Sequence, residues 1–66
     1  MNELKAAVAS QKAKYGISTK DIADALGMSP GNVNKIIREG TISYAVLRQL
    51  SNYLHFSEEQ KKDILT

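Results

Sequence analysis

The sequence predicts an all-α domain of five short helices, and two observations carry that prediction. Apolar residues recur at the three- and four-residue spacing of helices along most of the 66 residues, and strand-like alternation is scarce. Each break between the apolar runs contains a serine suited to begin the next helix, and most breaks also contain a glycine suited to end the previous one. The breaks are short, so we expect a single domain over residues 1–66.

The first helix is expected at about residues 2–14. Asn2 is suited to cap its free amides, and Gly16 follows its end. One face of this helix carries its apolar side chains together with a glutamine and a tyrosine: Leu4, Ala7, Val8, Gln11 and Tyr15.

The second and third helices are joined by a very short turn. The second begins at Ser18, where Asp21 completes a variant of the capping box, and it ends at Gly27. The third begins at the pair Ser29-Pro30, because proline fits the first helical position, where no amide hydrogen bond is lost. It ends before Gly40.

The fourth helix is expected at residues 43–54, with Ser43 as its cap. Its inward residues are Val46, Leu47, Leu50, Tyr53 and Leu54. The last helix begins at Ser57, with Gln60 in the capping-box position. We expect the aromatic residues at helical spacing to lie in the core: Tyr15, Tyr53 and Phe56.

Composition excludes several classes of protein. There is no cysteine, which excludes disulfides and cysteine-based zinc sites, and the single histidine, His55, has no partner for catalysis or metal binding. We therefore expect no enzyme, no cofactor and no metal. The apolar runs are too short to span a bilayer, and the first residues do not form a signal peptide. The absence of cysteine fits a reducing cytoplasm, where we expect the protein to act.

Charge is unevenly distributed along the chain. The net charge is +2, and residues 10–48 hold six basic residues against three acidic ones. Residues 49–66 hold two lysines against three acidic residues. This distribution alone leaves open whether the basic part is a nucleic-acid surface or an ordinary solvated one.

Residues 19–38 have the features of a helix-turn-helix. Two helices that cross closely need a small residue where they meet, and Ala23 is such a residue. The turn needs a residue that tolerates positive φ, which Gly27 supplies. Val33 is placed to fill the angle between the helices, and the other inner positions are apolar: Ile22, Leu26, Met28, Ile36 and Ile37.

Because each core position of the motif holds a residue of suitable type, the sequence resembles the phage Cro and repressor family of bacterial and phage transcription regulators. The resemblance is carried by IADALGMS and NVNKII, and by the flanking segments YGISTKDIA and SYAVLRQLSNYLHFS. It implies a sequence-specific regulator that binds double-stranded DNA, most similar to a repressor of Cro type acting on a near-palindromic operator.

The resemblance also implies which residues meet the bases. In the family, the start and outer face of the motif's second helix enter the major groove. The corresponding positions here are Asn34, Lys35, Arg38, Asn32, Gly31 and Pro30. Asparagine pairs with adenine, and lysine or arginine with guanine. The alternative is that Asn32 and Asn34 are ordinary solvated side chains.

The chain departs from the family pattern at the start of this helix. The family often carries glutamine or serine there, whereas Pro30 and Gly31 have no side chain that can donate to a base. Base discrimination is therefore expected to shift toward Asn34 and Lys35, or to rely on close backbone approach and on DNA shape.

Phosphate contacts are expected around the motif, from hydroxyl groups, lysines and exposed amides. Thr19 stands where the family often has glutamine. The complete set is Thr19, Lys20, Ser29, Thr41, Ser43, Tyr44, Lys12 and Lys14. For each lysine by itself, plain solvation is an equally good interpretation.

Two copies are expected to bind one operator, because a single short helix reads too few base pairs. The contact between the copies is expected at the junction of the last two helices, from Leu54, His55, Phe56 and Ser57, together with the last helix. This patch is smaller than the ~1,200 Å² of a stable interface. We therefore expect a weak homodimer that forms mainly on DNA.

A protein-interaction module is the alternative function, because a fold does not fix a function. An antitoxin, adaptor or anti-repressor on the same fold would show large apolar residues on the outer face of the third helix. The polar and basic residues there favour DNA.

Overall fold

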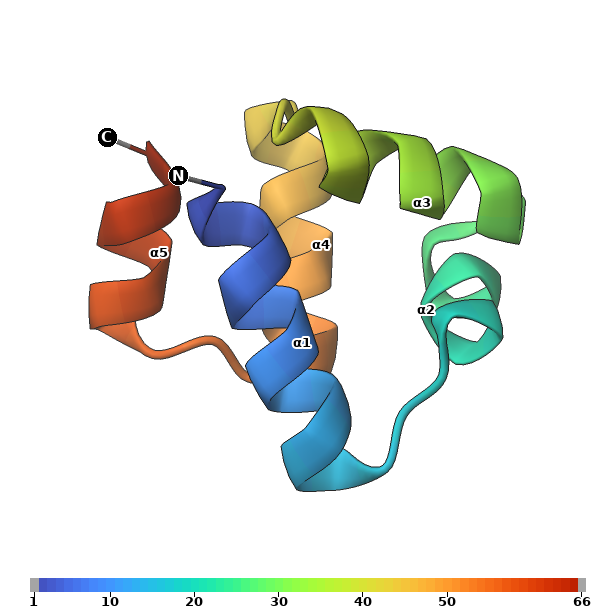
Figure 1. Ribbon diagram of the computed structural model, residues 1–66, viewed down its shortest axis with the longest axis horizontal. Coiled ribbons are helices and arrows are strands. Elements are labelled where there is room, and N and C mark those ends of the chain that lie inside the picture. Colours follow the sequence, from blue (N-terminus) through green and yellow to red (C-terminus); the bar gives the residue numbers. More distant parts are fainter. Residues whose placement is uncertain (1, 66) are drawn as a thin grey trace.

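The computed structural model describes residues 2–65, which form five α-helices (Figure 1). The helices are α1, Glu3–Tyr15; α2, Thr19–Leu26; α3, Pro30–Glu39; α4, Tyr44–Leu54; and α5, Glu58–Leu65. The described residues contain no strand. The prediction of an all-α fold with five short helices is confirmed.

Each helix begins directly after the residue predicted to cap it. Ser18 and Asp21 form the complete capping box of α2, in which the Asp21 amide donates to Ser18 Oγ over 3.1 Å. Ser57 and Gln60 exchange the same two bonds at the start of α5. At the end of α4, His55 adopts the left-handed conformation with φ 58°, which is the only positive φ of a non-glycine among residues 2–65.

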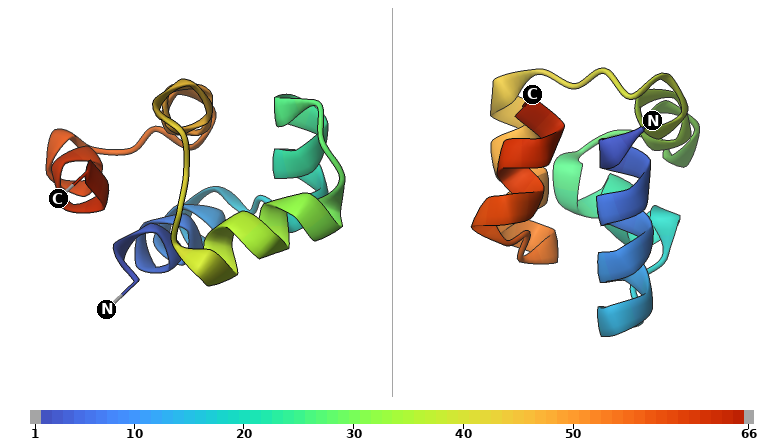
Figure 2. Two further views of the ribbon diagram at one scale, coloured as in Figure 1. Left: turned by 90° about the horizontal axis from the view of Figure 1, so that it is seen from above. Right: turned by 60° about the vertical axis from the view of Figure 1, so that its left-hand side comes forward.

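α1 and α4 lie at the centre of the molecule. α2 and α3 pack against each other on one side of this pair, and α5 packs against α1 on the other side (Figures 1 and 2). The helix-turn-helix pair and the last helix are thus separated by the two central helices.

One apolar core joins the helices. Its buried members come from α1, α2, α3, α4 and the link to α5: Leu4, Ala7, Val8, Ile22, Ala23, Val33, Leu47, Leu50, Leu54 and Phe56. Half-buried apolar residues surround this core, among them Tyr53 and Ile64. Burial of the side chains is the main force that holds so small a domain together.

The prediction that Tyr15 lies in the core is wrong. Tyr15 is 45% exposed, and its ring packs on the His55 ring with 5.3 Å between centroids. Tyr15 is the last residue of α1, where Gly16 turns the chain in the left-handed conformation. Ile17 follows the turn and packs against the core in its place.

Gln11 is the polar residue of α1 that the core buries. Its side-chain Nε2 donates to the Leu54 carbonyl over 2.7 Å and to the His55 carbonyl over 3.2 Å, and its Oε1 accepts from Gln60. The last carbonyls of a helix lack partners inside the helix. Gln11 therefore caps α4 and joins α1, α4 and α5.

The described part of the chain contains neither a membrane-spanning helix nor a candidate metal site. No helix there is long and apolar enough to cross a membrane. Residues 2–65 also contain no cluster of three or more histidine, cysteine or acidic side chains placed to hold a metal ion.

Candidate nucleic-acid interface

The junction of α2 and α3 fixes the direction of α3. Ala23 is fully buried, with 0% of its surface exposed, and Val33 is buried on the facing side of α3. Gly27 ends α2 at φ 70°, and the next amide, that of Met28, donates to the Ala23 carbonyl over 3.0 Å. A residue with a side chain is strained at this φ, so glycine permits the sharp turn.

The outward face of α3 is polar and free of internal partners. Asn34, Lys35 and Arg38 are all exposed. Within residues 2–65, none of their side chains makes a hydrogen bond or an ion pair. A ligand can therefore bind these side chains without breaking any contact inside the domain.

The start of α3 combines a tight cap with open backbone. Ser29 Oγ accepts from the Asn32 amide over 3.2 Å, and Pro30 is the first helical residue. At Gly31, an added Cβ would meet no atom within 4 Å. Glycine is therefore not required there by the fold. The Asn32 side chain turns back toward Met28, with 3.5 Å from Nδ2 to the sulfur, so it points less freely outward than Asn34.

Asn2 holds the far end of α3. Its Oδ1 accepts from the Lys5 amide over 3.0 Å, which caps α1, while its Nδ2 donates to the carbonyl of Ile37. Gly40 lies against the same side chain, because an added Cβ would come within 3.1 Å of the Asn2 amide atoms. One side chain thus ties the beginning of α1 to the end of α3.

A lysine and a threonine meet at the beginning of α2. Lys12 Nζ donates to Thr19 Oγ1 over 2.8 Å, which places an ammonium group beside the first residue of the helix. The first amides of a helix lack internal partners and attract anions. Lys20 is exposed next to this pair.

The capping box also sets the charge of Asp21. The backbone N–H of Ser18 donates to the carboxylate over 3.0 Å and holds the pKa of Asp21 below its ordinary value of 3.8. The hydrogen bond with the Ser18 side chain and the nearby charge of Lys20 lower the pKa further. The carboxylate therefore stays ionised, and it offsets part of the positive charge at the beginning of α2.

The remaining hydroxyl groups lie near the end of α3 and the beginning of α4. Ser43 caps α4 by accepting from the Val46 amide over 3.3 Å, and Thr41 is exposed in the loop before it. Tyr44 is 69% exposed. Lys14 belongs to another part of the surface, where its ammonium lies 5.5 Å from the centre of the Tyr15 ring.

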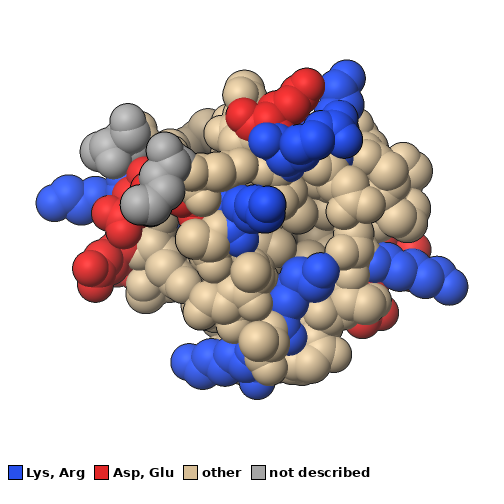
Figure 3. Space-filling model, in the orientation of Figure 1, with Lys and Arg blue, Asp and Glu red and all other residues tan. Residues whose placement is uncertain are grey.

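Charge differs between the two sides of the molecule. On the face that Figure 3 shows, basic side chains are spread from the bottom through the centre to the right, whereas acidic side chains crowd at the left edge, over α5, with smaller groups at the top and the right. The basic side is the side of α1, α2 and α3 (Figure 1). This distribution favours a polyanion on the helix-turn-helix side.

A family model for helix-turn-helix proteins matches residues 9–60, which is most of the chain. The chain belongs to the helix-turn-helix family. The family is one of DNA-binding regulatory domains of phage and bacterial regulators, as the sequence predicted. Searches among curated proteins and among solved structures returned no match.

The helix-turn-helix domain brings only part of the predicted dimer contact to its surface. Leu54 is 0% exposed and Phe56 is buried, so both side chains fill the domain's own core. Their side chains therefore offer almost no surface to a second copy. His55 and Ser57 are exposed at this corner, and they are the two members of the predicted contact whose side chains reach solvent.

Three positioning contacts of the helix-turn-helix domain were absent from the sequence prediction. The sequence indicated Asn2 only as the cap of α1, Gln11 only as a member of a face, and Lys12 and Thr19 only as separate phosphate contacts. Asn2 and Gln11 make contacts 35 and 43 residues away along the chain. No local spacing signals such contacts, although a glutamine on an otherwise apolar face does indicate a buried polar partner.

Proposed function

We propose that the domain is a sequence-specific regulator that binds double-stranded DNA, acting as a repressor of Cro type on a near-palindromic operator. One observation carries the proposal. The outward face of α3 presents Asn34, Lys35 and Arg38 without internal partners, next to a beginning of α2 that is suited to bind a phosphate. In helix-turn-helix proteins the second helix of the motif lies in the major groove.

Base discrimination is assigned to Asn34 and Lys35. Asparagine forms a bidentate pair with adenine, and lysine donates to guanine O6 and N7. Arg38 lies one turn further along the same face. Asn32 contributes less, since its amide is turned toward Met28.

Selection of binding sites from random duplex DNA tests this function. We expect one enriched, near-palindromic sequence. Lys35→Ala should then weaken binding to that sequence by about 1–3 kcal/mol and relax the preference at one base pair. An equal loss on selected and random DNA would make Lys35 a phosphate contact, and enrichment of no sequence would contradict the proposal.

Gly31 gives a second test that separates folding from DNA binding. In the free protein the space beside Gly31 is open, and alanine is favoured over glycine inside a helix by roughly 0.5–1 kcal/mol. Gly31→Ala should therefore raise the melting temperature. If the DNA backbone or a base edge approaches α3 closely there, the same variant should bind the selected duplex more weakly. Unchanged affinity would place the DNA away from Gly31.

Pairing on DNA is part of the proposal. With Leu54 and Phe56 in the core, the junction of α4 and α5 offers little apolar surface to a second copy. Two copies should therefore assemble on half-sites about one helical turn, ~34 Å, apart, rather than in free solution. Sedimentation of the protein with and without the selected duplex measures this. A tight dimer without DNA, or full affinity for a single half-site, would refute pairing on DNA.

A further inference from the structure

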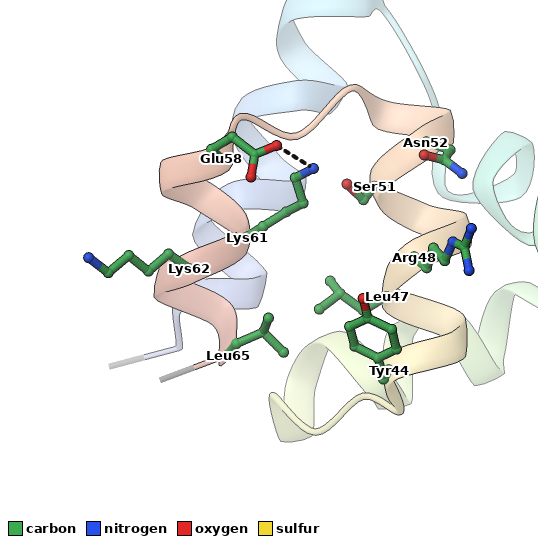
Figure 4. A pocket seen from close by; sticks show the side chains of 9 residues that line it. All are labelled: Tyr44, Leu47, Arg48, Ser51, Asn52, Glu58, Lys61, Lys62 and Leu65. Atoms are coloured by element: carbon green, nitrogen blue, oxygen red, sulfur yellow. Dashed lines mark ion pairs between the residues drawn. The ribbon is translucent and has the colours of Figure 1, made fainter.

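α4 and α5 leave an open groove between them. α5 packs against α1 through half-buried Ile64 and through Gln60, whose side chain donates to Gln11, so its opposite side faces α4 without closing on it. The groove has a volume of about 550 Å³. Figure 4 shows Lys61 and Leu65 of α5 facing Leu47 and Ser51 of α4 across it.

The groove has an apolar floor and one apolar end, where Tyr44 and Leu65 lie, while Glu58 and Asn52 lie at the other end (Figure 4). Leu47 is buried at its base, while Tyr44 and Leu65 are 69% and 59% exposed. These two residues are among the few large apolar side chains that residues 2–65 leave so exposed. Both lie on this one groove. Exposed apolar surface gathered in a concave site is a feature of interaction surfaces.

The charges around the groove are predominantly positive. Arg48, Lys61 and Lys62 line it, against one acidic residue, Glu58. The other acidic residues of α5, Glu59 and Asp63, line the surface on the side of α1. Figure 4 shows Lys61 pointing toward α4 and Lys62 pointing away from it, so the positive charge available in the groove comes from Lys61 and Arg48.

The single acidic residue is weakly held. Lys61 Nζ lies 2.9 Å from Glu58 Oε1, but the Glu58 side chain is 93% exposed. Exposed ion pairs contribute little stability, so a carboxylate from a partner can replace Glu58 at small cost.

We propose that this groove binds an acidic amphipathic helix of a partner protein. Apolar residues on one face of such a helix would cover Leu47, Leu65 and Tyr44, while its carboxylates would meet Arg48 and Lys61. The groove runs between two helices, which is the shape that accepts a third. Because α5 and α2 lie on opposite sides of the central helices, the partner would leave the outward face of α3 uncovered (Figure 1).

Two other occupants fit less well. A second copy bound through the same patch would bring the basic patch of one copy against the same basic patch of the other, since both sides of a two-fold contact use the same surface. A duplex would bury the apolar floor against phosphates, which leaves the buried Leu47 and the exposed Leu65 without suitable partners.

The experiment uses the full chain, labelled with ¹⁵N, and a synthetic helical peptide with leucines on one face and glutamates on the other. A matched peptide carries lysine in place of each glutamate. We expect saturable binding of the acidic peptide, with chemical-shift changes at α4 and α5, and much weaker binding of the basic one.

Variants identify the contact. Leu65→Ser should weaken binding roughly tenfold through lost apolar burial, and Arg48→Glu should weaken it about fivefold. Lys5→Glu makes the same change of charge at an exposed position of α1 and should leave the affinity unchanged. Circular dichroism melts establish that each variant is folded.

Several outcomes would overturn the proposal. Equal affinity for both peptides would show nonspecific apolar binding. Chemical-shift changes outside α4 and α5, or binding that does not saturate, would show that the groove is not the binding site. Concentration-dependent self-association that Leu65→Ser abolishes would assign the groove to a second copy. Loss of duplex binding in Arg48→Glu with unchanged peptide binding would assign it to DNA.

Discussion

The helix-turn-helix and the first helix are held in place by different kinds of contact. The α2–α3 pair depends on apolar packing around Ala23 and Val33, and the polar contacts within it are short-range, as between Ser18 and Asp21. α1 is instead joined to the other helices by side chains that reach far along the sequence, from Asn2 to Ile37 and from Gln11 to Leu54.

This difference shows that local and long-range contacts have different roles in the stability of a small domain. The local contacts of α2 and α3 define each helix end separately, so the motif is determined largely within its own residues. The position of the motif relative to the other helices depends on the shared apolar core and on two contacts of α1, from Asn2 to Ile37 and from Lys12 to Thr19. Buried or half-buried hydrogen bonds of this kind contribute little when made but are costly when one partner is removed.

The largest expected effect concerns the apolar contact of the motif. Ala23→Leu should destabilise the fold by about 3 kcal/mol, because a larger side chain at a fully buried position forces α2 and α3 apart. Urea unfolding measures the loss. Ala25→Leu, on the exposed side of the same helix, should change stability by less than about 0.5 kcal/mol. Similar losses in the two variants would contradict the placement of Ala23.

Removal of the long-range cap should have the next largest effect. Gln11→Ala leaves the Leu54 and His55 carbonyls without their donor and should cost about 2 kcal/mol in the free energy of unfolding. Gln49→Ala is the control, since Gln49 is an exposed glutamine of α4. If both variants unfold at the same urea concentration, the Gln11 contact contributes nothing.

A comparison of two glycines separates local strain from the long-range contact. Gly27→Ala and Gly40→Ala both force alanine to φ near 70° and should each cost about 1 kcal/mol. Gly40→Ala should cost roughly 0.5–1 kcal/mol more, because its Cβ would come within 3.1 Å of the Asn2 side chain. That excess should vanish in an Asn2→Ala background. An excess that persists there would place its cause elsewhere.

The smallest effect should be the acid dependence of the capping box. Because the pKa of Asp21 is lowered, its contribution to stability is present above the ordinary value of 3.8 and is lost as the pH falls through the lowered value. Asp21→Asn should be less stable than the parent at neutral pH, and the two should converge in acid. Unfolding measured across this range tests it, with Asp24→Asn as the control for loss of one charge. If the stability of the parent and of Asp21→Asn changed with pH in parallel, the capping box would not be the source of the acid dependence.

The sequence predicted the contacts that repeat at short spacing. Every helix begins after its expected cap, because a serine or asparagine bonds an amide three residues away and both groups are visible in one short segment. The exposed face of α3 also follows from sequence, since a buried Val33 fixes the direction of residues around one helix.

Long-range partners were beyond this reasoning. Gln11 and Leu54 are adjacent only after α1 and α4 pack, and Lys12 meets Thr19 only because Gly16 reverses the chain between them. For the same reason the sequence placed Leu54 and Phe56 both in the core and in the contact with a second copy, and only the core placement is seen in the structure. Apolar periodicity indicates burial but does not distinguish burial in the domain's own core from burial against a second molecule.

The bond between Lys12 and Thr19 orients a cation without neutralising it. The partner of Lys12 is a hydroxyl group, whereas the partner of Lys61 is a carboxylate. Lys12 therefore keeps its full charge and its surrounding counterions while its position is restricted. A lysine of this kind that meets a DNA phosphate still releases a counterion and makes the slope of log affinity against log salt concentration more negative by about 0.9. Its conformational entropy has already been reduced in the free protein, so ionic strength rather than side-chain ordering would govern its contribution.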